Sequence, residues 1–254
     1  DWYGDPIPSQ NGYIVDRVVS GADLGVGSFS GLANIFVDNE TEKIYLVDQE
    51  NGRIIITEET FDPSKVEVMD TFKYSDVWTE SQSVIKKTTL NKPSGIFVTH
   101  YKGDTLIYIA DFANERVLAC YEDGSIFMEY TKPSGDLYDA NTTFNPKNIV
   151  VDNALNVYVV ITSITTGMVQ FSSDGSFNGY YGANRVEATA EVIANMFWKM
   201  IYTREQIMKM RHAVPIEIGN CDIDASGFIY TVTGTKSSET DILKKLNPAG
   251  DNIY

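Results

Sequence analysis

A fourfold internal repeat constrains the fold of this chain more than any other feature of its sequence. Each copy has an apolar segment followed, after a turn, by a second segment that contains a tyrosine. The distance from the start of the first segment to that tyrosine is 10 to 13 residues in every copy. The first segments are 34–38, 95–99, 148–152 and 220–224, and the tyrosines are Tyr45, Tyr108, Tyr158 and Tyr230. Such regularity predicts one supersecondary unit repeated in tandem.

The rest of each copy supplies two more strands. A third apolar segment follows the tyrosine segment, and in three copies a turn containing glycine then leads toward a fourth. These turns are 122–125, 173–176 and 248–251, and glycine provides the positive φ that a tight hairpin needs. Each copy is therefore predicted to be a four-stranded antiparallel meander. Tandem meanders are typical of propeller blades, so we predict an all-β fold, a β-propeller with four recognisable blades.

The first two copies share the pattern Asp-x-x-Asn-x-Arg between their second and third strands. Its members are Asp48, Asn51, Arg53, Asp111, Asn114 and Arg116. Asp and Asn side chains bond the backbone of turns, and Arg can fork to the Asp carboxylate or to nearby carbonyls. The alternative is a ligand-binding arginine. Recurrence in successive copies favours the structural interpretation.

These residues resemble NHL repeats. The resemblance rests on Asp48-Gln-Glu-Asn-Gly-Arg-Ile54 and Asp111-Phe-Ala-Asn-Glu-Arg-Val117, and it covers about residues 30–184 and 216–254. Copies three and four lack the Asn-x-Arg element. The whole chain is similar to secreted or lipid-anchored NHL-repeat proteins of gut Firmicutes, which are often found beside sugar-uptake systems. The resemblance implies an NHL-type propeller of about six blades.

The repeat divides the chain into four parts. Residues 1–30 are predicted to be an extended leader that includes a ring-closing strand over 13–19, and 31–186 hold blades 1–3. Residues 187–215 are a helical insertion, and 216–254 are blade 4, which we expect to be truncated. Four blades of a six-bladed ring leave open edges, which predicts a tendency to self-associate.

The insertion differs in character from the blades. Apolar pairs recur every four residues from 192 to 201, and Thr203 with Gln206 forms a capping box, which together predict an α-helical pair. Its apolar stripe is Met196, Phe197, Trp198 and Met200. The stripe either caps the propeller or docks a partner. Exposing it in a free protein is unfavourable, which favours the cap.

Charge and composition exclude several function classes. The chain carries Lys+Arg 20 against Asp+Glu 35, a net charge of −15, which disfavours nucleic acid and anionic membranes as partners. No apolar run approaches the ~18 residues of a transmembrane segment. The start at Asp1 and the resemblance together predict an extracellular or cell-surface protein whose signal peptide has been removed.

Residues that carry chemistry are sparse. Neither a Gly-x-Ser-x-Gly elbow nor a phosphate-binding loop is present. His100 is predicted to lie exposed in a turn and His212 to end a helix, while Cys120 and Cys221 lie in strands and are expected to be buried thiols. We therefore expect no catalytic residue, no bound metal and no cofactor.

Three asparagines stand in register at the starts of the predicted innermost strands. Asn34, Asn148 and Asn220 are expected to ring one mouth of the channel, with Gly95 at the matching position of copy two. They either cap the incoming chain or bind a ligand, which makes non-catalytic recognition of a protein or glycan our first hypothesis. The alternative is a hydrolase of the gluconolactonase-like propeller type, which would use Ca²⁺ or another divalent cation. Amides alone make a weak site for such a cation.

Overall fold

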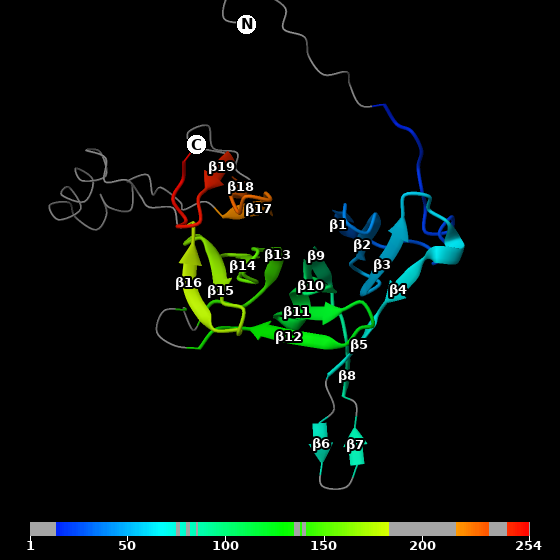
Figure 1. The fold of residues 1–254 in the computed structure, drawn as a ribbon, viewed down its shortest axis with the longest axis horizontal. Coiled ribbons are helices and arrows are strands. Elements are labelled where there is room, and N and C mark those ends of the chain that lie inside the picture. The colour runs from blue at the N-terminus through cyan, green and yellow to red at the C-terminus, as the bar shows by residue number, and fades with distance from the viewer. Residues whose placement is uncertain are drawn as a thin grey trace, which may run out of the picture.

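The computed structural model describes residues 14–74, 77–79, 82–84, 86–134, 138, 141–182, 217–233 and 243–253. Four antiparallel sheets make up the body of the molecule (Figure 1). Three of them have four strands, and the last has three. We call these sheets blades 1 to 4 in chain order.

Within each blade, the strands follow one another in chain order from the innermost strand outward. Blade 1 consists of β1 (Leu32–Asp38), β2 (Lys43–Asp48), β3 (Arg53–Glu58) and β4 (Glu67–Met69). Blade 2 consists of β9 (Pro93–Tyr101), β10 (Asp104–Asp111), β11 (Arg116–Tyr121) and β12 (Ile126–Thr131). Blade 3 consists of β13 (Pro146–Val151), β14 (Val157–Ile161), β15 (Met168–Phe171) and β16 (Phe177–Tyr181). Blade 4 consists of β17 (Ile218–Ile223), β18 (Ile229–Thr233) and β19 (Leu243–Leu246).

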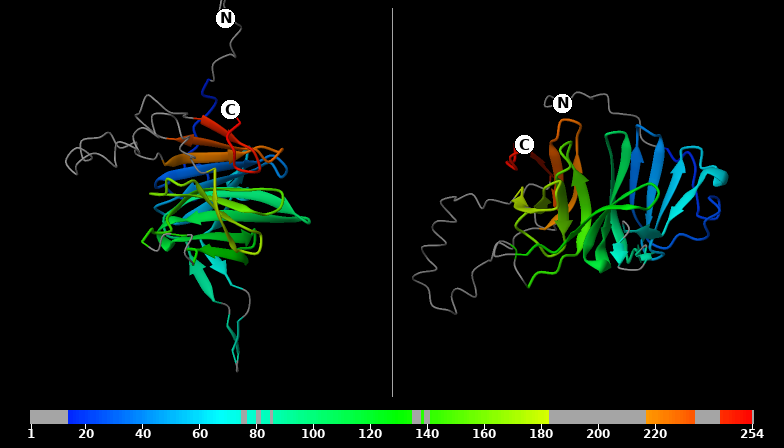
Figure 2. Two further views of the ribbon diagram at one scale, coloured as in Figure 1. Left: turned by 90° about the vertical axis from the view of Figure 1, so that its left-hand side faces the viewer. Right: turned by 60° about the horizontal axis from the view of Figure 1, so that its bottom comes forward.

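The blades stand side by side in an arc. The innermost strands β1, β9, β13 and β17 neighbour one another in that order, and the outer strands radiate from them (Figures 1 and 2). The arc leaves an open side between blade 4 and blade 1. An isolated bridge from Leu246 to Asn252 starts a fourth strand on blade 4. The predicted all-β, propeller-like arrangement of four blades is confirmed.

Helix is nearly absent from the described ranges. They contain two short 3-10 turns, η1 (Pro63–Lys65) and η2 (Phe112–Asn114). The predicted helical pair at 187–215, with its stripe Met196, Phe197, Trp198 and Met200, lies outside the described residues, as does His212.

The connection from blade 1 to blade 2 carries a hairpin that the repeat did not predict. Its strands are β5 (Thr71–Lys73), β6 (Val77–Thr79), β7 (Gln82–Val84) and β8 (Lys87–Thr89), and β6 with β7 projects away from the blades (Figure 1). Phe72 is fully buried, and the Lys73 N–H donates to the Gly124 carbonyl at 2.8 Å. The base of the hairpin is therefore fastened to blade 2.

The ring-closing strand expected over 13–19 stays a prediction, because the last blade with which it would pair is not among the described residues. The described part, residues 14–19, has no strand, and Ile14, Val15 and Val18 are exposed. A β-strand persists only when its backbone pairs with a neighbouring strand, and no strand of the described ranges pairs with this segment.

The apolar core is divided into three layers, each between two neighbouring blades. The layer between blades 2 and 3 is rich in aromatic rings, among them Tyr130 and Phe171 with centroids 5.3 Å apart. Of the repeated tyrosines, Tyr45, Tyr108 and Tyr158 are buried and Tyr230 is half-buried. Burial of each face against the next blade holds the arc together.

Candidate functional site

The innermost strand of every blade carries an irregularity at the same place. The register shifts between Leu32 and Asn34 in β1, between Pro146 and Asn148 in β13, and between Ile218 and Asn220 in β17. In β9 the equivalent shift lies opposite Ala110 and Asp111. A bulge inserts one residue and re-aims the side chains beside it. Here it turns the three asparagines toward one another.

The three asparagines form a hydrogen-bonded row across the arc. Asn34 Nδ2 donates to Asn148 Oδ1 at 3.3 Å, and Asn148 Nδ2 donates to Asn220 Oδ1. Asn148 Nδ2 also donates to the Cys221 carbonyl at 3.1 Å. Asn148 is buried, Asn34 is half-buried and Asn220 is exposed. Residues 34, 148 and 220 thus meet although blades separate them in the sequence; we call them the amide row.

Gly95 of blade 2 takes the matching position and leaves room for the row. A Cβ there would lie 2.8 Å from the Lys147 carbonyl oxygen and 2.9 Å from Asn148 Cα. Both distances are shorter than a side-chain carbon tolerates. The glycine that breaks the asparagine pattern in copy two is therefore required by the close approach of blades 2 and 3.

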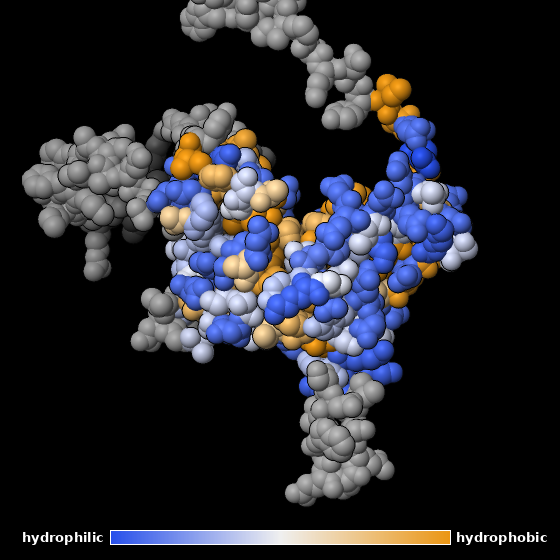
Figure 3. Space-filling view, viewed as in Figure 1, coloured by the Kyte–Doolittle hydropathy of each residue, from blue (hydrophilic) through white to orange (hydrophobic). Residues whose placement is uncertain are grey.

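The amide row lines a cavity of about 470 Å³ in the hollow of the arc. Its polar lining adds Asn39 and Asp222, and its apolar lining comes from the same innermost strands, including Phe36 and Phe97. These two rings meet edge to face at 5.2 Å. The space-filling view shows the hollow between blades 4 and 1, with apolar side chains on its wall (Figure 3). We call this cavity the channel mouth.

The repeated Asp-x-x-Asn-x-Arg pattern forms a closed network in blade 2. Arg116 Nε and Asn114 Nδ2 both donate to Asp111 Oδ2 at 2.8 Å, and the Asn91 N–H donates to Asp111 Oδ1 at 2.7 Å. The guanidinium also donates to the Thr89 carbonyl at 3.1 Å. The network therefore joins the turn after β10 to the chain that enters the blade.

Blade 1 repeats this geometry. Arg53 Nε and Asn51 Nδ2 donate to Asp48 Oδ2, both at 2.8 Å, and Ser30 N–H donates to Asp48 Oδ1 at 2.7 Å. Arg53 also donates to the Val26 carbonyl at 2.8 Å. In both blades the arginine binds protein groups and not the channel mouth.

A second set of aspartates recurs at the ends of innermost strands, and the sequence pattern alone had not drawn attention to it. Asp152 accepts hydrogen bonds from Tyr158 OH at 3.1 Å and from the Asn156 N–H at 2.9 Å. Asp224 accepts from Tyr230 OH at 3.0 Å. Asp38 is the equivalent residue of blade 1 and accepts from the Glu40 N–H at 3.1 Å. The signal was an aspartate at the end of the first segment in three of the four copies.

His100 lies at a junction of two blades, so its prediction as an exposed turn residue was wrong. His100 Nε2 lies 2.9 Å from Asp38 Oδ2 of blade 1, and the histidine side chain is only 22% exposed. Thr105 Oγ1 lies 3.4 Å from the other ring nitrogen. The partner is 62 residues away in the sequence, so local pattern could not identify it.

Two carboxylates in these networks give the fold a defined acid sensitivity. Burial alone would raise the pKa of Asp48, but hydrogen bonds from Asn51, Ser30 and Arg53 outweigh it and lower the pKa. The pKa of Asp38 is also lowered, because Thr41, Glu40 and His100 outweigh the opposite effect of burial. Each carboxylate thus stabilises the fold above its unfolded pKa of about 3.9 and loses that contribution as the pH falls through its folded pKa.

Thermal unfolding between pH 6 and pH 2.5 should therefore show a falling midpoint below about pH 4. Asp48→Asn should show a shallower fall, because that titrating group is gone. Asp16→Asn, at an exposed carboxylate, is the matched control and should retain the wild-type slope. A midpoint that does not change below pH 4 would contradict this assignment.

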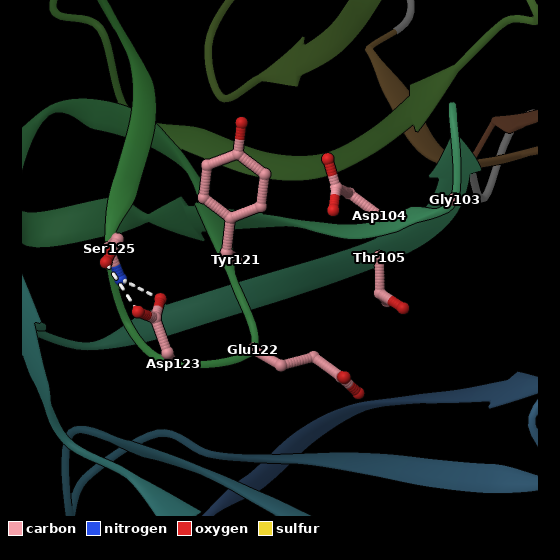
Figure 4. A pocket seen from close by; sticks show the side chains of 7 residues that line it. All are labelled: Gly103, Asp104, Thr105, Tyr121, Glu122, Asp123 and Ser125. Carbon is pink, nitrogen blue, oxygen red and sulfur yellow. Dashed lines mark hydrogen bonds between the residues drawn. The ribbon is translucent and has the colours of Figure 1, made fainter.

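A second cavity, of about 530 Å³, lies between the hairpin turns of blade 2 (Figure 4). Its lining is Gly103, Asp104, Thr105, Tyr121, Glu122, Asp123 and Ser125. Asp123 accepts from the N–H and the hydroxyl of Ser125, both at 2.8 Å, and Glu122 accepts from Lys43. Its acidic groups are thus largely occupied in holding the turn and the junction with blade 1.

Metal-binding and thiol chemistry find little support. Within the described ranges there is no group of three or more His, Cys, Asp or Glu side chains that could hold a metal ion. Cys120 and Cys221 are free and buried, and burial raises the pKa of both thiols. Both cysteines are therefore protonated at neutral pH and poor nucleophiles.

Comparison with known proteins finds solved structures that resemble this chain in fold at low sequence identity. No protein-family model and no curated protein matches the chain. A catalytically inactive virginiamycin B lyase from Staphylococcus aureus matches at 11% identity and a TM-score of 0.45, over 87% of this chain and 54% of that one. A streptogramin B lyase matches at 11% identity and a TM-score of 0.44, over 88% and 68%.

The extracellular domain of the one component system BT4673 from B. thetaiotaomicron also matches, at 11% identity and a TM-score of 0.46. The match covers 87% of this chain and 24% of that one, so this chain spans less than two thirds of the length of two of these three structures. At this level the matches carry no argument about function. Among the residues described, no helix is long and apolar enough to cross a membrane.

Proposed function

We propose that this protein is a non-catalytic recognition module of the NHL-propeller type, acting at the cell exterior and binding a neutral glycan in the channel mouth. The observation that carries the proposal is the amide row. Asn34, Asn148 and Asn220 come from three blades and meet on the wall of one cavity. A ligand seated there would contact every blade.

The channel mouth offers both kinds of hydrogen-bonding group that a sugar needs. Within the described part of the chain, the Asn220 amide makes contacts through its oxygen, which leaves both Nδ2 protons for a ligand. Asn34 Nδ2 uses one proton for Asn148. Asp222 Oδ1 accepts from the Ile223 N–H at 2.9 Å, which leaves Oδ2 as an acceptor. Donors and an acceptor on one wall suit neighbouring hydroxyl groups, each of which donates and accepts.

The apolar part of the wall and the overall charge narrow the ligand class. Phe36 and Phe97 lie beside the polar groups and suit the C–H face of a pyranose ring. The net charge of −15 repels phosphorylated and anionic sugars. A neutral oligosaccharide therefore fits this site better than a charged one.

The divalent-cation hydrolase has less support from the same site. Every oxygen of the amide row already accepts a hydrogen bond: Asn34 from the Ile35 N–H, Asn148 from Asn34, and Asn220 from Asn148 and the Cys221 N–H. A hard cation prefers several carboxylate oxygens, and Asp222 is the one carboxylate among the described residues that line this mouth.

Binding of neutral oligosaccharides, surveyed on a glycan array and measured by calorimetry, tests the proposal. Asn220→Ala and Asn34→Ala should each weaken binding about tenfold, the equivalent of one or two lost hydrogen bonds. Asn178→Ala removes an exposed amide of β16 outside the channel mouth and is the matched control. Absence of binding to every neutral sugar, or equal affinity in all variants, would refute the proposal. Loss of binding in EDTA and its return with Ca²⁺ would favour the hydrolase.

A further inference from the structure

The three side chains of the amide row are chemically the same but bond in two different ways. Asn34 Oδ1 accepts from the N–H of the following residue, Ile35, at 2.7 Å. Asn220 Oδ1 accepts in the same way from the N–H of Cys221, at 3.0 Å. Asn148 instead reaches into the next blade, where its Nδ2 donates to the Cys221 carbonyl at 3.1 Å. The middle asparagine therefore differs in its contacts from the two on either side of it.

These backbone groups determine which way each amide is turned. A backbone N–H only donates and a backbone carbonyl only accepts. The two N–H groups therefore hold the oxygens of Asn34 and Asn220, and the Cys221 carbonyl holds the nitrogen of Asn148. The bonds within the row agree with this, since Asn34 donates to Asn148 and Asn148 donates to Asn220. Reversing any one of the three amides would bring two donors or two acceptors face to face.

Asn148 is also the buried member of the row. It is 8% exposed, whereas Asn34 is half-buried and Asn220 is exposed. A Cβ on Gly95 would lie 3.0 Å from Asn148 Oδ1, so the glycine leaves room for this amide in its present orientation. The oxygen of Asn148 accepts from one neighbour and its nitrogen donates to the other. Asn148 is therefore placed to act on a ligand through Asn34 and Asn220.

We propose that Asn148 is a positioning residue that fixes the amides of Asn34 and Asn220 with their remaining N–H groups toward the channel mouth. This inference deepens the proposed function and rests on it for the nature of the ligand. With Asn148 in place the row offers hydrogen-bond donors, so the ligand groups that it binds are oxygens. Asn148 belongs to blade 3 and its two partners to blades 1 and 4, so this donor pattern exists only when three blades are assembled.

Asn148→Asp tests the proposal, because it keeps the size of the side chain and removes its donor. At pH 8 a carboxylate at position 148 would face the Cys221 carbonyl and the Asn220 amide oxygen. Burial and these oxygens disfavour the charged form, so the pKa of this carboxyl should be raised, and protonation would restore one donor. The midpoint temperature of thermal unfolding should lie below that of the wild type at pH 8, and the difference should shrink toward pH 5. Affinity for a neutral glycan should be more than about tenfold weaker at pH 8 and should recover toward pH 5.

Asn220→Asp is the matched variant, since it makes the same chemical change at the next position of the row. There the new carboxylate would accept from Asn148 Nδ2 and from the Cys221 N–H, which favours the charged form. Its difference from the wild type in midpoint temperature should therefore stay constant between pH 8 and pH 5. Its glycan affinity should be reduced at both pH values, because the donors that face the ligand are gone.

The midpoint temperatures are measured without ligand, so they test the role of Asn148 even if no neutral sugar binds, a result that would refute only the proposed function. The same pH dependence in both variants would overturn the inference. Recovery of stability at pH 5 without recovery of glycan affinity would also overturn it, because Asn148 would then support the fold without orienting the row. If Asn148→Asp is unfolded at every pH, hydrogen exchange of the wild-type side-chain amides decides. The Asn148 protons should exchange more slowly than those of Asn220, and equal rates would contradict the proposal.

Discussion

Replacing Arg116 by alanine is expected to lower the free energy of unfolding by about 3–5 kcal/mol, the range measured when one partner of a buried ion pair is removed. The Asp111 side chain is fully buried and Arg116 is 7% exposed, so the remaining carboxylate could not recover its hydration. The substitution also removes the donors to Thr89 and Tyr74 that fasten the entering chain to the blade. Urea denaturation followed by circular dichroism measures the change.

Two variants make the result for Arg116 interpretable. Arg53→Ala removes the equivalent residue of blade 1, whose side chain is 18% exposed, and should destabilise the protein less. Arg116→Lys keeps the charge but loses the forked geometry, so its effect should fall between wild type and alanine. A loss below about 1 kcal/mol for Arg116→Ala would show that Asn91 and Asn114 alone satisfy the Asp111 carboxylate.

Gly95→Ala is expected to destabilise the protein by about 1–3 kcal/mol, the usual effect of overpacking a tight contact. The added Cβ would meet backbone atoms of Lys147 and Asn148, which cannot move aside as a flexible side chain can. The innermost strands of blades 2 and 3 must then separate, which strains the bond between Asn34 and Asn148. The midpoint temperature of thermal unfolding and the glycan affinity should therefore both fall.

Gly103→Ala is the matched control for Gly95. Gly103 has a φ of +92°, and a Cβ added there would meet nothing within 4 Å, so alanine strains the backbone without a collision. It should reduce stability and leave glycan affinity unchanged. Equal loss of glycan affinity in both variants would contradict the link between the amide row and the close contact at Gly95.

The repeat predicted the blades well, because the features that define a blade are local. Alternating apolar segments, the tyrosine spacing and the glycine turns all lie within one copy, and the observed φ of +80° at Gly124 and +84° at Gly175 matches the turn prediction. The hairpin β5–β8 was missed because it occurs once and so had no second copy to reveal it. The helical pair stays a prediction.

The sequence predicted that three asparagines occupy equivalent strand positions, but it did not predict the contacts between blades that bring them together. Spacing alone placed Asn34, Asn148 and Asn220 at equivalent strand positions, and the structure joins them by hydrogen bonds. Gly95 looked like a departure from the pattern, because its reason lies in the backbone of another blade. His100 was misjudged on the same ground, since its contact with Asp38 crosses a blade junction. Local sequence does not contain such contacts between repeats.

The division of the core into layers between adjacent blades has a consequence for how such a protein can change over time. A layer depends only on the two sheets that enclose it, so duplication of one repeat in the gene adds a sheet and a layer and leaves the others intact. The number of blades and the side chains of the channel mouth can therefore evolve separately. A lineage could change its number of blades without changing its recognition surface, and it could change that surface without changing the number of blades.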